Sequence, residues 1–312
     1  GRERQIAREV SMIGSSPRIL NSDISLLEYR NTLIEKTRFA PGRFLWTWIQ
    51  TEPTFANARW RDSSNKLPIV IEPEQIRLQV YATLSAGCRA VGYWTTNRLD
   101  DTSAPGALER KLVIEQLNRE IDLIEPWLAT GSVISHVPFQ LKQKGSPRIT
   151  QLGVDFKRSG SKRLQVNEQL SEREMLLQRE KDAAAEMQAA VIHSEYGTLI
   201  LPVWYRDGSQ FVPDQMAGND ATIVIPGENV SASVWELSTT RIKNLDRKRV
   251  NGGVEISLPK FDMTSIIIMT SDQGLIEKLR KKVALISPQA AETSLKLSRA
   301  KLERCQKTNA EL

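Results

Sequence analysis

Residues 44–53 place a short apolar and aromatic run directly before a group of polar residues, which constrains the fold more than any other segment. The run over 44–49, Phe-Leu-Trp-Thr-Trp-Ile, is rich in residues typical of β-strands, and Gln50 and Glu52 follow it. A second such run, residues 90–97, begins about forty residues later, and the segment between them has apolar residues at helical spacing. Strand, helix and strand in this order predict two parallel strands whose polar ends lie at one edge of a sheet.

Residues 1–130 carry three consecutive strand–helix units. The predicted strands are 9–14, 44–49 and 90–95, and the predicted helices are 26–39, 72–86 and 108–128. Glu72, Pro73 and Glu74 suit the start of a helix, because proline needs no amide hydrogen there and acids meet the positive end of the helix dipole. Three units cannot close an eight-stranded barrel, so the other five units are expected before Gly1, which makes the upstream part of the same polypeptide an expected partner.

Residues 131–276 change to short β-prone runs separated by turn sequences, a pattern that predicts an antiparallel β-sandwich. A helical insert, rich in Glu, Gln, Leu and Ala, is expected at about 166–191. Residues 277–312 are predicted to form a basic helical tail, of one or two helices broken near Pro288. The expected fold class is an α/β partial TIM barrel, comprising the last three βα units in 1–130, plus an all-β antiparallel sandwich and the helical tail.

Charge and composition argue against several classes of protein. The net charge is +6, but residues 277–312 hold nine Lys and Arg against four Glu, so the rest of the chain carries only +1. The basic charge therefore belongs to a solvated helix face, and nucleic acid is not the expected partner, although an acidic partner stays an alternative. No run of eighteen apolar residues predicts a membrane span. Two cysteines and two histidines give little support to a disulfide framework, a metal site or a Ser-His-Asp triad, and no cofactor is expected.

The order of several short motifs resembles a known group of enzymes. Trp-x-Trp-x-Gln at 46–50 is followed by Pro-Glu-Gln-Ile-Arg at 73–77 and Gly-Tyr-Trp at 92–94. Together with the string from Gly252 to Asp262, these motifs resemble the C-terminal part of a glycoside-hydrolase-like (β/α)₈ barrel protein and its β-sandwich. The barrel belongs to the retaining superfamily that uses two glutamates. The resemblance implies an extracellular or periplasmic protein that binds or hydrolyses an oligo- or polysaccharide.

Glu52 is the candidate catalytic residue. The resemblance implies a nucleophilic glutamate at the end of the seventh strand, and Glu52 is the carboxylate that fits if 44–49 is that strand. The second glutamate, the acid/base residue, would lie upstream of this chain. The position of Glu52 at the carboxyl end of a strand is where barrel enzymes keep their sites. The alternative is a loop glutamate paired with Arg59 or Arg61.

Candidate substrate-binding residues lie on the same strands and in the loop beyond them. Trp48 and Trp94 offer aromatic planes on which a pyranose ring can stack, and Gln50 and Asn97 can bond its hydroxyls. Asp100 lies in the following loop and can bind hydroxyls or a cation. The structural alternatives are core packing for the tryptophans and a solvated turn for the aspartate.

Three functions stay open on the sequence. The full-length protein is a glycosidase with Glu52 as its nucleophile, or a non-catalytic carbohydrate-binding protein, or a structural protein whose sandwich and tail bind partners. Whether this chain belongs to an enzyme at all, and in what oligomer it works, is not decided by these motifs.

Overall fold

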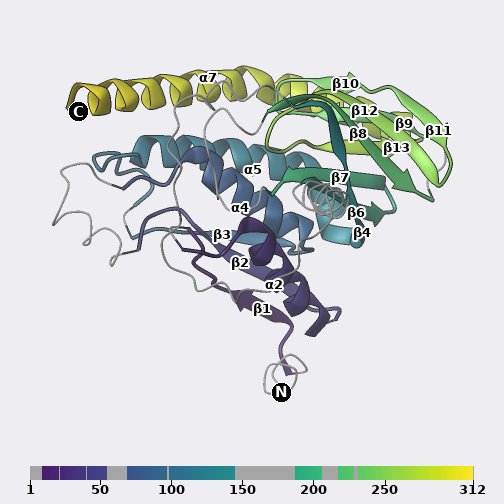
Figure 1. Ribbon diagram of the computed structural model, residues 1–312, viewed down its shortest axis with the longest axis horizontal. Helices are drawn as coiled ribbons and strands as arrows, with labels where there is room; N and C mark the ends of the chain where they lie inside the picture. The colour runs from purple at the N-terminus through teal and green to yellow at the C-terminus, as the bar shows by residue number, and fades with distance from the viewer. Residues whose placement is uncertain are drawn as a thin grey trace, which may run out of the picture.

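The computed structural model describes residues 9–20, 22–39, 41–54, 69–96, 98–144, 187–205, 217–227 and 231–311. Its first half alternates strands and helices: β1 (Met12–Ser15), α2 (Leu26–Phe39), β2 (Phe44–Gln50), α4 (Pro73–Ser85), β3 (Ala90–Trp94) and α5 (Ala107–Thr130) (Figure 1). Its second half contains β4 (Ser132–Pro138), β5 (Gln140–Lys144), β6 (Met187–Ser194), β7 (Gly197–Trp204), β8 (Gly218–Pro226), β9 (Ser233–Leu237), β10 (Ile242–Asn244), β11 (Arg247–Val250), β12 (Gly253–Phe261), β13 (Ile267–Thr270) and α7 (Gln273–Glu311).

The first three strands form a parallel sheet in the order β1-β2-β3. Along β2, Leu45, Thr47 and Ile49 are buried, whereas Trp46 is half-buried and Trp48 is exposed. This alternation follows from the strand period of two, which sends successive side chains to opposite faces. One face of the sheet therefore packs into the core, and the two tryptophans lie on the other face.

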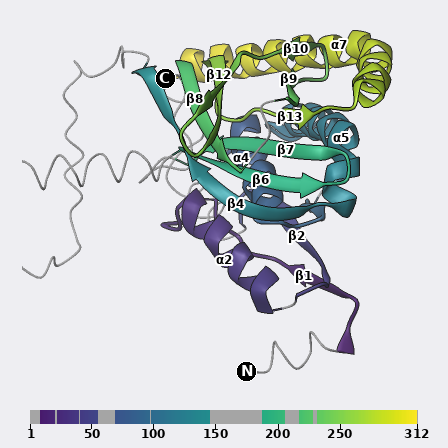
Figure 2. The same cartoon turned by 90° about the vertical axis from the view of Figure 1, so that its right-hand side faces the viewer.

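Helix α4 begins and ends where the sequence provides the signals. The side chain of Gln75 accepts the backbone N–H of Glu72 at 2.9 Å, Pro73 occupies the first turn, and the helix ends just before Gly87, which has a φ of +90°. Helix α4 contacts β2 and β3 of the parallel sheet on one side and β6 and β7 on the other, and α5 packs against α4, β6 and β7 (Figure 2). Helix α4 thus buries apolar residues against strands on two sides, which is why it is buried along most of its length.

The later strands form two antiparallel sheets. One sheet has six strands in the order β10-β9-β13-β7-β6-β4, and the other has four strands in the order β11-β12-β8-β5. Aromatic side chains join the two sheets: Phe261 of β12 lies 5.1 Å from Phe139 and 6.4 Å from Trp204 of β7, measured between ring centroids. The buried apolar residues of the sheets and of α2, α4 and α5 belong to one continuous core.

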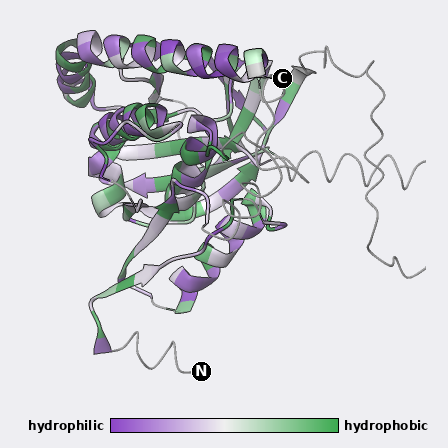
Figure 3. Cartoon of the chain, turned by 90° about the vertical axis from the view of Figure 1, so that its left-hand side faces the viewer, coloured by the Kyte–Doolittle hydropathy of each residue, from purple (hydrophilic) through white to green (hydrophobic). Residues whose placement is uncertain are grey.

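The C-terminal segment is a single helix, α7, and the expected break near Pro288 is wrong. The helix runs from Gln273 through Pro288 to Glu311 and lies along α5 (Figure 1). Buried residues such as Ile276, Leu279 and Val283 anchor its first turns, whereas hydrophilic residues prevail along the rest of it (Figure 3). Packing of the apolar side against the core keeps the helix continuous despite the cost of an internal proline.

The partial TIM barrel expected for residues 1–130 is wrong. The described residues form four helices and three sheets, most strands are antiparallel, and the parallel strands form a separate three-stranded sheet rather than an arc of a barrel. In a barrel the helices face outwards, but here α4 and α5 are covered by a second sheet. Of the insert expected at about 166–191, residues 187–191 lie in strand β6, and the others fall outside the described residues.

Within the described ranges, helices long and apolar enough to span a bilayer are not found.

Candidate functional site

Glu52 lies at the carboxyl end of β2, where it joins three elements. Its Oε1 accepts hydrogen bonds from Thr95 Oγ1 at 2.8 Å and from Arg110 Nη1 at 2.5 Å. Its Oε2 accepts the backbone N–H of Thr96 at 2.8 Å and also the hydroxyl of Thr96. Thr95 and Thr96 follow β3, and Arg110 lies in the first turns of α5. The carboxylate, which is only 7% exposed, therefore ties β2, β3 and α5 together.

These contacts keep the carboxyl group of Glu52 ionised. Burial raises its pKa, but the hydrogen bonds from Thr96 and Thr95 and the charge of Arg110 outweigh burial, so that the pKa lies below its usual range. Both oxygens are already engaged by protein donors. The arrangement is that of an anchor, and the role of Glu52 as a nucleophile stays a prediction.

We expect the contribution of Glu52 to stability to depend on pH. Because the pKa is lower in the folded state, the contribution is complete above the unfolded pKa of about 4.3 and is lost as the pH falls from there through the folded pKa. Urea unfolding of the wild type and of Glu52→Gln at pH 7, 4 and 3 should show the difference between them shrinking with acidity. A difference that stays constant across this range would contradict the assignment.

The side chain of Gln50 forms hydrogen bonds to other groups of the protein. Its Oε1 accepts the backbone N–H of Leu20 at 3.0 Å, and its Nε2 donates to the carbonyl of Glu52 at 3.1 Å. Its backbone N–H donates to Gln79 Oε1 at 3.1 Å. The amide is buried and orders the loops that follow β1 and β2. The bond predicted from Gln50 to a sugar hydroxyl stays a prediction, and it would use the second N–H or the second lone pair of an amide that these contacts hold in place.

Trp46 and Trp48 form an aromatic platform on the face of the parallel sheet opposite the core. Their ring centroids are 5.1 Å apart with an interplanar angle of 69°, and Trp48 is 38% exposed. Gly14 of β1 lies opposite Trp46, and Gly92 of β3 lies opposite Trp48. A Cβ atom at either glycine would stand 2.8 Å from the neighbouring indole, so the rings lie directly over the glycine backbone. This pairing of tryptophan with glycine is visible in the sequence once the strand register is known.

Of the remaining predicted binding residues, the structure describes Trp94 and Asp100. Trp94 is half-buried at the end of β3, and the guanidinium of Arg18 lies 4.7 Å from the centroid of its ring. The hydroxyl of Thr51 donates to the carbonyl of Trp94 at 2.5 Å. Asp100 forms an exposed ion pair with Arg98 at 2.8 Å, and Asn97 falls outside the described residues. Sites of three or more His, Cys, Asp or Glu suited to a metal ion are not found in the described part of the chain.

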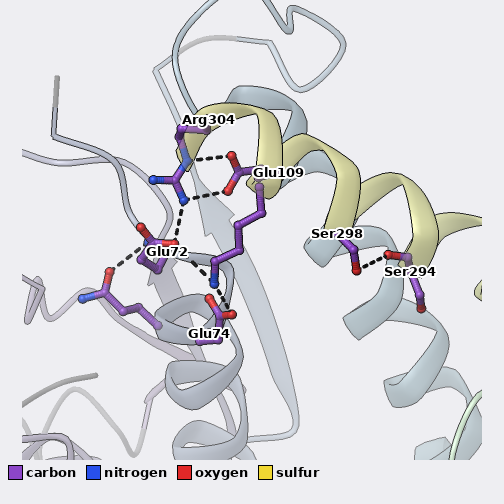
Figure 4. Close-up of polar contacts among 8 residues, drawn as sticks. Glu72, Glu74, Glu109, Ser294, Ser298 and Arg304 are labelled. Carbon is purple, nitrogen blue, oxygen red and sulfur yellow. Dashed lines mark hydrogen bonds and ion pairs between the residues drawn. The ribbon is translucent and has the colours of Figure 1, made fainter. Parts of the chain in front are cut away.

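The basic tail reaches the same end of the molecule, which sequence reasoning missed. Arg304 of α7 binds Glu109 through two hydrogen bonds of 2.7 and 2.9 Å, and it binds Glu72 at 2.7 Å (Figure 4). Lys301 pairs with Glu74. The basic residues of the tail were expected on a solvated helix face. Arg304 and Lys301 instead pair with acidic residues at the starts of α4 and α5. Glu109 lies in the first turn of α5, and its partner Arg304, 195 residues farther along the chain, leaves no local signal.

No protein family and no curated protein matches this sequence. Among solved structures, the chain is similar to a cycloisomaltooligosaccharide glucanotransferase from Paenibacillus sp., in a crystal structure complexed with cycloisomaltoheptaose. The sequences are 10% identical, the TM-score is 0.36, and the match covers 63% of this chain but only 27% of that chain. A carbohydrate-active enzyme is thus a weak structural neighbour, at a level that carries no argument about the activity or substrate of this chain.

Proposed function

We propose that this chain is a carbohydrate-binding protein that holds a sugar ring on the platform of Trp46 and Trp48. The observation that supports the proposal most directly is that the indole of Trp48, which is 38% exposed, lies against Gly92 on a sheet face that the core does not use. The flat C–H face of a pyranose is complementary to such a ring, and the glycine lets the indole lie close to the sheet.

Binding is favoured over hydrolysis by the state of Glu52. Retaining hydrolysis needs two carboxyl groups about 5 Å apart, one of them free to attack the sugar. Both oxygens of the Glu52 carboxylate instead accept hydrogen bonds from Thr95, Thr96 and Arg110, which leaves the group poorly placed to attack a sugar. We infer that Glu52 holds the ends of β2 and β3 in place.

Trp48→Ala is expected to weaken polysaccharide binding on the order of tenfold. Removing one stacking plane loses about 1.5 kcal/mol of apolar contact, and about 1.4 kcal/mol corresponds to a factor of ten. The measurement is affinity electrophoresis in gels that contain soluble α-glucan, β-glucan, xylan or galactomannan, with quenching of tryptophan fluorescence as a second readout.

Phe39→Ala is the matched control, because Phe39 is an exposed aromatic residue on α2 and not on the platform. It should bind like the wild type, and Trp48→Tyr should retain part of the affinity because it keeps an aromatic plane. If a gel retards the wild type and retards Trp48→Ala equally, and this holds for every such polysaccharide, the tryptophan platform is not the sugar-binding site. If no polysaccharide retards the wild type, the proposal of carbohydrate binding is itself wrong.

A further inference from the structure

Helix α7 has a packed side and an exposed side beyond its first turns. One side packs along α5 (Figure 1), where Thr293 and Arg304 bond residues of that helix and Ala290 is buried. At 3.6 residues per turn, a second row of residues lies on roughly the opposite side of α7. All members of this row are exposed, and together they form the outer seam: Ala284, Pro288, Ala291, Leu295, Ser298, Leu302 and Cys305.

The spacing of the outer seam is typical of a coiled coil. Successive members are four and three residues apart in alternation, as the a and d positions of a heptad are. Leu295 and Leu302 occupy the a position, and they are 50% and 58% exposed. A repeated row of exposed apolar side chains favours a partner helix, because pairing removes this surface from water.

The a and d positions of the outer seam differ in size. The a position holds Pro288, Leu295 and Leu302, whereas the d position holds only small residues: Ala284, Ala291, Ser298 and Cys305. In an antiparallel pair of such helices, each a residue faces a d residue of the other helix, so every large side chain meets a small one. In a parallel pair, small residues would face small residues and leave gaps in the seam. The sizes therefore favour an antiparallel pair of identical helices.

Charged residues on one flank of the outer seam select the register. Glu292 and Arg299 are both exposed and seven residues apart, too far to touch within one helix. When Leu295 faces Ser298 of a second copy, Glu292 of each helix lies beside Arg299 of the other. Shifting the pair by one heptad brings either Glu292 beside Glu292 or Arg299 beside Arg299, and like charges repel. The exposed ion pair of Glu292 with Lys296 uses one carboxylate oxygen and leaves the second for Arg299.

We propose that the outer seam binds a second copy of this chain, with the two α7 helices antiparallel over residues 288–305. A two-fold axis between positions 296 and 297 presents the same surface from both copies, as a symmetric dimer requires. The pairing of large with small residues and of Glu292 with Arg299 supports a second copy, because an unrelated partner does not need a surface that complements itself. The contact is about 27 Å long, so the dimer is expected to be reversible. The outer seam is separate from the aromatic platform, and dimer formation does not depend on carbohydrate binding.

Sedimentation equilibrium of the full chain should show a monomer–dimer equilibrium. Leu295→Glu and Leu302→Glu should each raise the Kd of the dimer about tenfold or more, because each places a carboxylate against an apolar layer. Both leucines are exposed in the monomer, so the variants are expected to fold, which circular dichroism checks. Ile134→Glu is the matched control and should leave the Kd unchanged, because Ile134 is 59% exposed but lies on β4.

Charge reversal tests the register. Glu292→Arg and Arg299→Glu should each weaken the dimer, because each brings like charges together across the interface. The double variant Glu292→Arg/Arg299→Glu restores opposite charges and should return the Kd close to that of the wild type. Since these residues do not touch within one helix, such a recovery requires contact between two copies. A double variant that dimerises no better than the single variants would overturn the proposed register.

Oxidation tests the orientation of the two helices. Position 288 faces Cys305 of the second copy, so Pro288→Cys should form a disulfide-linked dimer under mild oxidation, and replacing a proline inside a helix does not weaken that helix. The wild type should cross-link far less, because the two Cys305 residues lie at opposite ends of the interface and Cys88 is buried. Equally efficient cross-linking of the wild type through Cys305 would indicate parallel helices and overturn the proposal. A monomer at every concentration up to about 0.5 mM, or a wild-type Kd for both leucine variants, would also overturn it.

Discussion

Glu52→Gln is expected to lower the free energy of unfolding by about 3 kcal/mol at neutral pH, because it leaves a buried guanidinium without its counter-charge. Arg110 is as buried as Glu52, and its Nε and Nη2 atoms have no hydrogen-bond partner in the described structure. The ion pair with Glu52 is therefore the described contact that offsets the cost of burying its charge. The amide of glutamine would also lose the charge that attracts the donors of Thr95 and Thr96. The measurement is urea unfolding followed by circular dichroism.

Glu277→Gln is the matched control for this experiment. Glu277 also pairs with an arginine, Arg280 at 2.7 Å, but both side chains are largely exposed, so the substitution should change stability little. If Glu52→Gln unfolds at the same urea concentration as the wild type, Glu52 is not the anchor that its contacts indicate.

The same variant separates the two roles considered for Glu52. A nucleophile that is not needed for the fold would lose turnover with stability and sugar affinity unchanged. An anchor would lose stability, and sugar binding would weaken as the ends of β2 and β3 lose their connection. Measuring both quantities on one preparation of Glu52→Gln distinguishes these outcomes.

Arg304→Ala is expected to destabilise the protein by about 2 kcal/mol, less than a fully buried pair because Arg304 is partly exposed. The substitution leaves Glu109, which is almost completely buried, without the two bonds that Arg304 gives it. It also removes the ion pair with Glu72, so that α7 is held to α4 chiefly by Lys301. Thermal and urea unfolding measure the loss, and its size should fall as salt weakens the partly exposed pairs.

Lys296→Ala is the control for the contribution of the tail. Lys296 pairs with Glu292 of the same helix, and both side chains are exposed, so its removal should have little effect on stability. Equal stability of Arg304→Ala and Lys296→Ala would show that the contacts of the tail with α4 and α5 do not stabilise the fold.

The helices and strands of the first half could be predicted from local sequence. The helix predicted at 26–39 coincides with α2, the strand predicted at 44–49 lies within β2, and the helix predicted at 72–86 contains α4. Apolar periodicity, a proline at the first turn and a glycine after the last turn are properties of neighbouring residues, so they can be recognised without the rest of the protein. The insert and Asn97 lie outside the described residues and stay predictions.

Part of the candidate site also follows from local sequence. The parallel register of β2 and β3 brings Glu52 beside Thr95 and Thr96, as the predicted common edge requires. The alternative to a nucleophilic Glu52 was an ion pair with Arg59 or Arg61, which are outside the described residues, whereas the structure pairs Glu52 with Arg110, 58 positions away. The glycines beneath the tryptophans likewise acquire their role only when β1, β2 and β3 are aligned.

The sequence by itself determined the order of strands and helices in the first half of the chain and which strand ends carry polar residues there, because those properties depend on contacts a few residues apart. Only the tertiary structure decided that the parallel strands form a separate sheet, that α4 lies between this sheet and the six-stranded sheet, and that α7 binds the starts of α4 and α5. These features depend on contacts between residues distant in sequence, such as Glu72 and Arg304, and the energy of such contacts leaves no periodic pattern in the chain.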